Sequence, residues 1–391
     1  MSTAAQEAER LAEVPTERYD RIVRLAQAIF EVPIASLNLI GEDEQFAVAA
    51  VGTPTATYPL SAAICGHTVL QDDIFEVPDL REDERFREHS IVIGPSQVRH
   101  YAGVPLRAPS GQKVGALCLL DREPGRLDAG QREMLTDLGA VLEREIAVQA
   151  EMLRAGEVQR LLLPDQPPEL AGVEVAGRVQ QATEAGGDFF DWQVVPVPLG
   201  SRRLQVVLAD VMGKGLAASL IASEMRAVLR THSHYVEVDE AVRRTNDTTS
   251  RDLESNGRFV TLWAGRLDPV DGSVEFVDAG HGLAVVASER GVRRLAQEHP
   301  PLGVPVPSRW SSVRDVLAPD ESLVVVSDGV FDVFGGVDEA LDAVRAVAVS
   351  ARSCVELVDR TLEFVSGQGA TDDVTVVAVR TRPTGLERGD A

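Results

Sequence analysis

The stretch LQVVLADVMGKG (204–215) is an apolar run that reaches Asp210 and then passes into a glycine-rich turn. The same arrangement recurs in SLVVVSDGV (322–330), where Asp328 follows the apolar run. Such runs predict buried strands, and a carboxylate at the end of a buried strand is costly unless a cation or hydrogen bonds compensate it. Asp210 and Asp328 are therefore the first candidates for a functional site.

Further acids adjoin strands or glycine turns in the same way. Asp372 and Asp373 precede VTVVAV (374–379), and Asp188 follows a pair of glycines in GGDFFD (186–191). A role as turn former or helix cap explains any one of these acids taken alone. Four such positions together favour an oxygen-rich site of the kind that Mg²⁺ and Mn²⁺ prefer, although spacing alone does not establish that the acids converge.

The sequence around these acids, from about 170 to 381, is rich in short valine-dominated runs with few helices between them. This pattern predicts packed sheets flanked by helices. The helical stretches expected among the strands lie near 216–230, 237–254, 338–348 and 354–366.

The N-terminal part predicts a separate α+β domain, an antiparallel sheet with flanking helices. Apolar residues recur at helical spacing over 17–30, and strand signals follow. The turn at 109–111 joins the last two strands into a hairpin. The expected strands are 34–40, 46–51, 101–107 and 114–120.

A long helix is expected between these two parts, from Asp128, which caps it, to the stop at Pro164. Its apolar stripe continues past the edge of the N-terminal domain, which favours a dimerising coiled coil over a helix that packs only on its own domain. The stripe consists of Met134, Leu138, Val141, Val148, Met152 and Ala155.

The chain of 391 residues holds 61 acidic and 38 basic side chains, a formal net charge of -23. Phosphate backbones and anionic lipid repel such a chain, so we expect neither nucleic acid nor a membrane surface as a partner. Residues 1–13 lack the features of a signal peptide, and no stretch is apolar for long enough to cross a bilayer. The distant cysteines Cys65, Cys118 and Cys354 suit a reducing compartment and are interpreted as three small buried residues. We therefore expect a cytoplasmic protein.

Seven blocks of the C-terminal part resemble, in order, the SpoIIE-like branch of the PPM metal-dependent phosphatases. The resemblance covers about residues 157–381 and implies two stacked β-sheets with helices on both outer faces. The blocks are GGDFFD (186–191), ADVMGKG (209–215), FVTLWAG (259–265), DAGHG (278–282), PPLGV (300–304), SDGV (327–330) and TDDVTVV (371–377).

The resemblance implies two metal ions, Mn²⁺ or Mg²⁺, at one end of the sandwich, with Asp210 and Asp328 as the central catalytic ligands. The implied reaction is hydrolysis of a phosphoserine or phosphothreonine ester by a water that the ions activate. Carried over by position, the metal ligands are Asp188, Asp210, the Val211 carbonyl, Asp328, Asp372 and, less directly, Asp373.

Two residues near these motifs need separate interpretation. Where the family often has histidine, this chain has Lys214, which we interpret as a solvated lysine at a helix start. His281 in DAGHG is interpreted as a structural hydrogen-bonding residue, because the implied metals prefer oxygen. Members of this branch usually act on phosphorylated anti-sigma-factor antagonists, so a separate phosphoprotein of that kind is the expected substrate.

Residues about 17–146 resemble a GAF domain, most distinctively in YAGVPL (101–106) and GALCLLD (115–121). Such domains bind a small molecule in a pocket on one sheet face or only dimerise, and the sequence leaves both open. Cys65 is interpreted as a buried structural residue rather than a pocket residue or chromophore ligand.

These observations predict an α+β chain that acts as a metal-dependent protein serine/threonine phosphatase, regulated by its GAF domain within a homodimer. The alternative is a catalytically inactive protein that senses a ligand and docks a partner, against which the four aspartates argue. A nucleotide cyclase of the GGDEF type is not favoured, because Phe189 stands where that family has an acid. The predicted divisions are a GAF domain at 1–127, a helical linker at 128–163, a PPM-type αββα sandwich at 164–381 and a disordered tail at 382–391.

Overall fold

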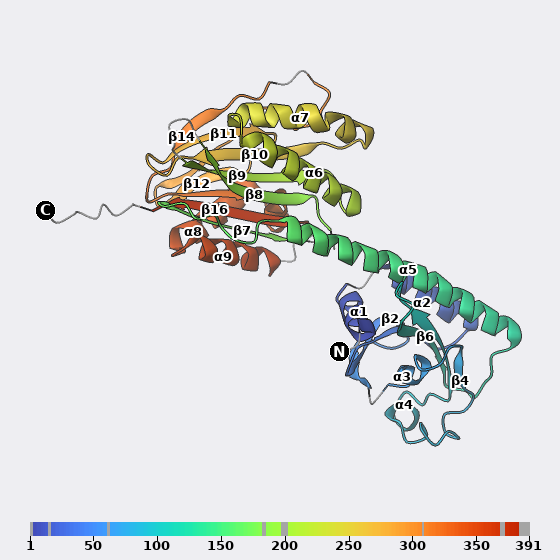
Figure 1. Cartoon of the computed structure of the whole chain (residues 1–391). Helices are drawn as coiled ribbons and strands as arrows, with labels where there is room; N and C mark the ends of the chain where they lie inside the picture. Colours follow the sequence, from blue (N-terminus) through green and yellow to red (C-terminus); the bar gives the residue numbers. More distant parts are fainter. Residues whose placement is uncertain are drawn as a thin grey trace. The chain divides into compact units, whose positions relative to one another are not determined.

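The computed structural model describes residues 3–14, 17–60, 63–181, 185–196, 202–306, 309–367 and 372–382. Contacts divide the chain into two compact units, Met1–Glu151 and Met152–Ala391, which Figure 1 colours along the sequence. The expected tail, 382–391, lies outside the described residues apart from Arg382. Within the described ranges, no helix has the length and apolarity that a membrane span requires.

The first unit is an α+β domain. Its elements are α1 (Thr3–Ala12), α2 (Glu17–Phe30), β1 (Ile34–Ile40), β2 (Glu44–Val51), β3 (Thr57–Pro59), α3 (Cys65–Thr68), β4 (Phe75–Val77), α4 (Ser90–Ile93), β5 (His100–Arg107), β6 (Lys113–Asp121) and the first part of α5 (Ala129–Leu162). The six strands form one antiparallel sheet in the order β3-β2-β1-β6-β5-β4. Helix α2 packs on this sheet through the buried side chains of Tyr19, Val23 and Ala26.

Local sequence signals located most of these elements. The predicted hairpin is the β5–β6 pair, and the predicted helix over 17–30 is α2. Asp128 caps α5 as expected, because its carboxylate accepts from the Gln131 amide at 2.8 Å while the Gln131 side chain accepts from the Asp128 amide at 3.0 Å. Helix α1 was not predicted.

The predicted stripe on α5 divides into two faces. Leu138 is only 8% exposed and lies with buried Leu135 and Leu142, so it packs within its own unit. Met134, Val141 and Val148 recur every seventh residue and are 41–44% exposed. The interpretation of Leu138 as part of a free seam was therefore wrong, whereas the other three side chains leave apolar surface uncovered.

The second unit has the αββα architecture that the family resemblance implied. Its elements are the end of α5, β7 (Val173–Gln180), β8 (Asp188–Pro196), β9 (Arg202–Val211), α6 (Leu216–Ser233), α7 (Val238–Ser255), β10 (Val260–Leu267), β11 (Ser273–Ala279), β12 (Ala284–Ser288), β13 (Gly291–Arg294), β14 (Val313–Val316), β15 (Ser322–Val326), the 3-10 helix η3 (Asp328–Val333), α8 (Val337–Ser350), α9 (Cys354–Ser366) and β16 (Val374–Thr381). The two sheets have the orders β14-β11-β10-β9-β8 and β13-β12-β15-β16-β7.

Three apolar layers hold the second unit together. Helices α6 and α7 cover the outer face of the first sheet, and α8 and α9 cover the outer face of the second, as Figure 1 shows. The layer between the sheets includes Trp192, Trp263 and Phe276. Because both faces of both sheets are buried, the open ends of the strands are where polar side chains gather.

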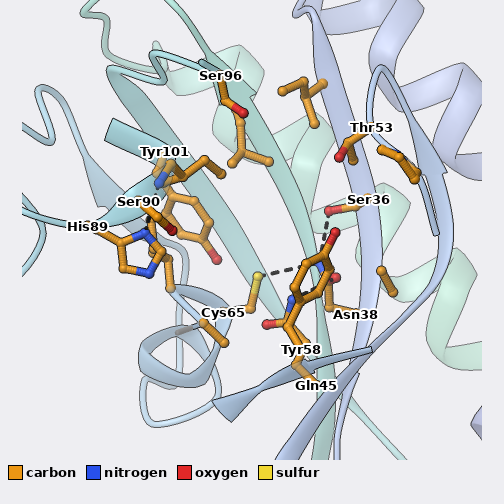
Figure 2. Close-up of a pocket in the computed structure, with 17 residues that line it drawn as sticks. Ser36, Asn38, Gln45, Thr53, Tyr58, Cys65, His89, Ser90, Ser96 and Tyr101 are labelled. Atoms are coloured by element: carbon orange, nitrogen blue, oxygen red, sulfur yellow. Dashed lines mark hydrogen bonds between the residues drawn. The ribbon is translucent and has the colours of Figure 1, made fainter. Parts of the chain in front are cut away.

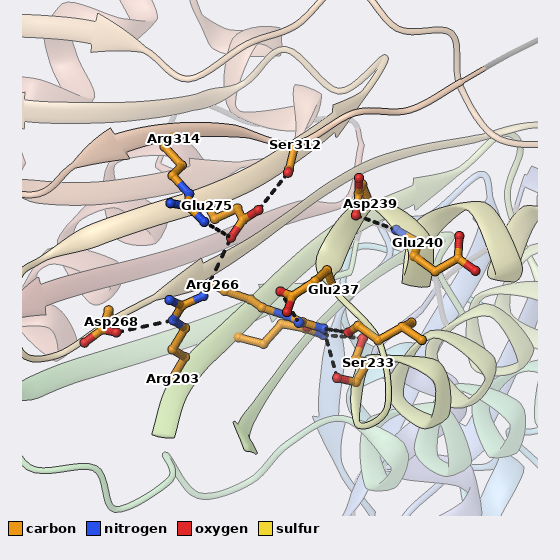
Figure 3. A network of polar contacts seen from close by, with 12 residues as sticks. Arg203, Ser233, Glu237, Asp239, Glu240, Arg266, Asp268, Glu275, Ser312 and Arg314 are labelled. Carbon is orange, nitrogen blue, oxygen red and sulfur yellow. Dashed lines mark hydrogen bonds and ion pairs between the residues drawn. The ribbon is translucent and has the colours of Figure 1, made fainter. Parts of the chain in front are cut away.

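One end of the first sheet is held by arginine networks (Figure 3). The buried Arg266 of β10 donates to the Gln205 side chain of β9 at 2.9 Å and to the Val236 carbonyl before α7 at 2.7 Å. Arg203 pairs with Asp268 at 3.3 Å and lies 3.6 Å from Glu275. The arginines at this end of the sheet therefore have carboxylate or carbonyl partners. The strand register places Asp210 at the other end of β9.

Candidate functional site

The strand register brings the predicted acids to one end of the two sheets. Asp188, the first residue of β8, lies directly opposite Asp210 near the end of β9. In the other sheet, β15 ends just before Asp328, while Asp372 and Asp373 precede its partner β16. The Thr375 hydroxyl of β16 donates to the Asp188 carboxylate at 2.6 Å and so joins the two sheets at this end.

Two glycines allow the loop before Asp188 to approach these acids closely. The Gly187 amide donates to the Asp373 carboxylate at 3.1 Å. A Cβ atom on Gly186 would lie 2.0 Å from that same carboxylate, so a larger residue does not fit without moving it. The Asp373 carbonyl in turn accepts from the Ser327 hydroxyl at 3.1 Å. Asp373 thus holds the loop in place.

The space beside Gly187 is surrounded by oxygen atoms. A Cβ atom built there would lie 2.4 Å from the Val211 carbonyl, 3.2 Å from the Gly213 carbonyl and 3.3 Å from a carboxylate oxygen of Asp210. Carbonyl and carboxylate oxygens are the donors that Mg²⁺ and Mn²⁺ select. The glycine lets these oxygens approach its backbone closely, and this donor set fits a hard divalent cation.

The acids influence one another electrostatically. Burial, followed by the negative charge of Asp210, raises the pKa of Asp188 well above its usual value. Burial together with the charges of Asp328 and Asp372 raises the pKa of Asp210 to about 6. Asp328 is exposed at the edge of this acidic end. Partial burial of its carboxylate, followed by the negative charge of Asp372, also raises its pKa. Nearby positive charge would lower the free energy of all three ionised groups.

Lys214 places a positive charge at this end of the sandwich. Its ammonium lies 3.0 Å from the Asp372 carboxylate, and its side chain is 49% exposed. The lysine is therefore a member of the acidic cluster and more than the solvated helix-start residue that we expected. Among the described residues, no three His, Cys, Asp or Glu side chains gather tightly enough to hold an ion by themselves.

Comparison with protein families agrees with this arrangement. Residues 200–382 match the family model of stage II sporulation protein E (SpoIIE), and residues 15–146 match that of the GAF domain. The chain carries a SpoIIE-like domain after a GAF domain. Both resemblances noted in the sequence are thereby confirmed. The SpoIIE match includes Asp210, Asp328 and Asp372 and begins after Asp188.

Curated relatives match only parts of the chain. A cyclic di-GMP phosphodiesterase of Pseudomonas aeruginosa is 34% identical over 114 residues, 29% of this chain and 19% of that protein. The IcfG protein of Synechocystis is 24% identical over 264 residues, 59% of this chain and 41% of that protein. The chain thus spans less than half the length of these two relatives.

Solved structures share the fold of the SpoIIE-like domain. The PP2C domain of SiaA from Pseudomonas aeruginosa has a TM-score of 0.50 at 17% identity, over 60% of this chain and 97% of that one. The RsbU and RsbW domains of a Mycobacterium tuberculosis protein have a TM-score of 0.48 at 28% identity, over 55% of this chain and 63% of that one.

Two other acids of the SpoIIE-like domain have structural partners. Asp191 is held by Arg226 at 3.0 Å and by Arg230 at 2.7 Å. Asp278 accepts from the backbone amide of His281 at 2.7 Å. Burial lowers the pKa of His281 to about 4, so its ring is neutral at physiological pH. Among the described residues, its buried Nε2 atom has no hydrogen-bond partner.

The GAF domain contains a cavity of about 260 Å³ (Figure 2). Its wall includes Asn38, Gln45, Tyr101 and Cys65, and the side chains that line it carry no Asp, Glu, Lys or Arg within the described part of the domain. Cys65 is buried, at 6% exposure, and also forms part of this wall. It is therefore a pocket residue as well as the buried residue that we expected.

The geometry generates a prediction about metal-free stability. Asp210→Asn removes a charge from a cluster in which burial and neighbouring carboxylates oppose ionisation. In a chelator at pH 7, the variant should therefore unfold at a temperature a few degrees higher than the parent. A gain of about 1 kcal/mol shifts the unfolding midpoint by about 2–4 °C in a domain of this size. Addition of Mn²⁺ should stabilise the parent and not the variant. Differential scanning calorimetry with and without Mn²⁺ measures both effects, and Asp320→Asn, at an exposed surface pair, is the matched control. A lower midpoint for Asp210→Asn in chelator would contradict the electrostatic argument.

Proposed function

We propose that the SpoIIE-like domain removes phosphate from phosphoserine or phosphothreonine of a partner protein, using two divalent cations, Mn²⁺ or Mg²⁺. The observation that carries this proposal is the meeting of Asp188, Asp210, Asp328 and Asp372 at one end of the sandwich. When bound, such ions offset charge on the phosphoryl oxygens and lower the pKa of a water molecule.

The residues around the ions would have two roles, metal binding and positioning of the metal ligands. Asp188, Asp210, Asp328 and Asp372, with the Val211 carbonyl, would hold the cations. Thr375 fixes the orientation of the Asp188 carboxylate through its 2.6 Å hydrogen bond. We assign Asp373 mainly to positioning, because its carboxylate already accepts from the Gly187 amide.

Lys214 has the geometry of a phosphate contact. Its half-exposed ammonium already pairs with Asp372, so a small rotation of the side chain reaches solvent beside the acids. A lysine binds phosphate as a point charge. Its side-chain hydrogen bond to Asp372 raises its pKa, so it would bind the phosphoryl group rather than protonate the leaving oxygen.

The substrate that we propose is a phosphorylated anti-sigma-factor antagonist, because the SpoIIE-like branch to which the domain is similar usually acts on such proteins. The second candidate function is a catalytically inactive docking protein that senses a ligand through its GAF domain. The two functions differ in whether the protein turns over a phosphoester in the presence of metal.

Turnover should depend on the metal and on each central aspartate. Asp328→Asn is expected to lower the rate of p-nitrophenyl phosphate hydrolysis at saturating Mn²⁺ by at least about 10³-fold. The reason is that the change removes a proposed metal ligand, and the metal would stabilise the charge that develops on the phosphoryl oxygens. The same assay on a phosphoserine-bearing antagonist protein tests the substrate. Asp320→Asn should keep the parental rate. Turnover that persists after exhaustive chelation, or an inactive parent at saturating Mn²⁺ and Mg²⁺, would favour the docking function.

Gln159 links helix α5 to the loop that carries Asp188. Its side chain is 4% exposed and clamps both backbone groups of Gly186: it donates to the Gly186 carbonyl at 2.8 Å and accepts from the Gly186 amide at 3.1 Å. Gly186 precedes Asp188 by two residues. We propose that a change in α5 reaches the metal ligands through this clamp.

Loss of the clamp should therefore affect metal binding more than folding. Gln159→Ala removes the two hydrogen bonds to Gly186, each contributing about 1 kcal/mol, together with one from the Gln181 side chain at 2.9 Å. The change is expected to raise the Mn²⁺ concentration for half-maximal activity by about tenfold. Arg160→Ala, at the exposed neighbouring position, is the control. An unchanged Mn²⁺ dependence of Gln159→Ala would leave α5 without this route to the site.

The uncovered stripe of α5 supports the proposal of a homodimer. Met134, Val141 and Val148 continue at the same seven-residue spacing through Ala155 to Leu162, which is 45% exposed. Pairing with the same stripe of a second copy would remove this apolar surface from water. In such a pair, a ligand of the GAF domain could favour one helix arrangement over another and so bias the clamp at Gln159.

Charges on the stripe should separate the dimer. The double change Val141→Glu and Val148→Glu places like charges in the seam, while both positions are exposed in the single chain, so the fold is retained. Light scattering should report a dimer for the parent and a monomer for this variant at micromolar concentration. Thr136→Glu, exposed on another face of α5, should remain dimeric. A monomeric parent would show that α5 is only a tether.

A further inference from the structure

Two of the three cysteines form a buried thiol pair in the GAF domain. The sulfur atoms of Cys65, at the start of α3, and Cys118, on the central strand β6, lie 2.9 Å apart although the residues are 53 positions apart in the sequence. Both are free thiols. A disulfide joins its sulfurs at about 2.0 Å, so the bond would require an approach of only about 0.9 Å.

The environment of the pair gives a small oxidant a route to one sulfur only. Cys65 lines the 260 Å³ cavity, and Figure 2 shows its sulfur among the lining side chains. Cys118 is fully buried behind it, at 0% exposure. Thiols that are buried without access are inert. Here, the cavity admits a small uncharged molecule to Cys65, and Cys118 is the nearest group with which an oxidised Cys65 can react.

Polar neighbours hold both sulfurs in this arrangement. The Asn38 side-chain amide donates to the Cys65 sulfur at 3.4 Å. The Tyr101 hydroxyl lies 3.2 Å from the Cys118 sulfur and 2.6 Å from the Thr68 hydroxyl on α3. These contacts orient the two sulfurs toward each other, and the network is independent of the phosphatase site.

We propose that Cys65 and Cys118 form a reversible disulfide when a small peroxide enters the GAF cavity. The Cys65 sulfur attacks one oxygen of hydrogen peroxide; the O–O bond breaks, Cys65 becomes a sulfenic acid and one water leaves. The Cys118 sulfur then attacks the Cys65 sulfur; the S–S bond forms, the S–O bond breaks, and the departing hydroxide takes the Cys118 proton as a second water. Two thiols are thus oxidised by two electrons in total, and one peroxide is reduced to two waters.

The product has a structural consequence that a single oxidised cysteine lacks. A Cys65–Cys118 bond ties α3 to β6 across one wall of the cavity and closes a long loop of chain, which restricts the unfolded state. The bond is reversed by thiol–disulfide exchange with a small dithiol. Oxidation is therefore expected to raise the thermal midpoint of the GAF domain and to change the cavity in which a ligand would bind.

The test uses the full chain, reduced and then exposed to hydrogen peroxide. After free thiols are blocked with N-ethylmaleimide, mass spectrometry of a non-reducing digest should identify one Cys65–Cys118 cross-linked peptide pair, two hydrogens lighter than the sum of its thiol peptides. Dithiothreitol should restore both thiols. Cys354→Ser removes the third thiol, buried in the other unit, and should form the same bond at the same rate.

Two comparisons make the result decisive. Cys118→Ser should stop at the sulfenic acid of Cys65, trapped by dimedone, and should consume one thiol per peroxide where the parent consumes two. In urea, the parent should lose its preference for the Cys65–Cys118 pair over pairs with Cys354. The proposal is overturned if all three thiols survive peroxide in the folded chain, if Cys65 proceeds to sulfinic acid without the bond, or if Cys354 pairs as readily. The parent and Cys354→Ser leave the thiol pair intact, so a folding failure of Cys118→Ser would not remove the test.

Discussion

The structure of the SpoIIE-like domain depends on a set of like charges that the β-ladder forces together. Asp188 and Asp210 are opposite each other in adjacent antiparallel strands, and neither can move away without a change of register that would turn every core side chain of its strand. The burial of Val207, Ala209 and Val211 in the apolar layers fixes that register. The favourable packing of the sandwich therefore offsets the electrostatic repulsion between these carboxylates.

The contrast with structural carboxylates in the same domain shows that this repulsion is not a general feature of the chain. Asp191, three residues beyond Asp188 on β8, is matched by Arg226 and Arg230. At the far end of the sheet, Arg266 and Arg203 have carboxylate or carbonyl partners. At the acidic end, the compensating groups include the Thr375 hydroxyl, the Gly187 amide and Lys214. Clustered oxygen donors whose charge is only partly compensated are the kind of site that a hard cation stabilises.

Much of this could be predicted from the sequence, because strand-end acids and glycine turns are local signals. The αββα fold, the GAF domain and the positions of the four long helices of the second unit were predicted, and both domain families were confirmed. The contacts that organise the site could not be predicted, since Thr375 and Asp188 are 187 residues apart and Gln159 and Gly186 are 27 residues apart. The error at Leu138 has the same origin: a helical stripe does not reveal which of its residues its own sheet already covers.

Helix α5 makes two kinds of contact that belong to different cores. In its first turns Gly139 lies against Val104 of the GAF sheet, where a Cβ atom would approach within 3.0 Å, so this part of the helix is packed with little room to slide. Twenty residues later, Gln159 holds both backbone groups of Gly186. Each contact therefore fixes α5 within its own unit, by close packing against a strand of the GAF domain and by side-chain hydrogen bonds to the loop before Asp188 in the SpoIIE-like domain.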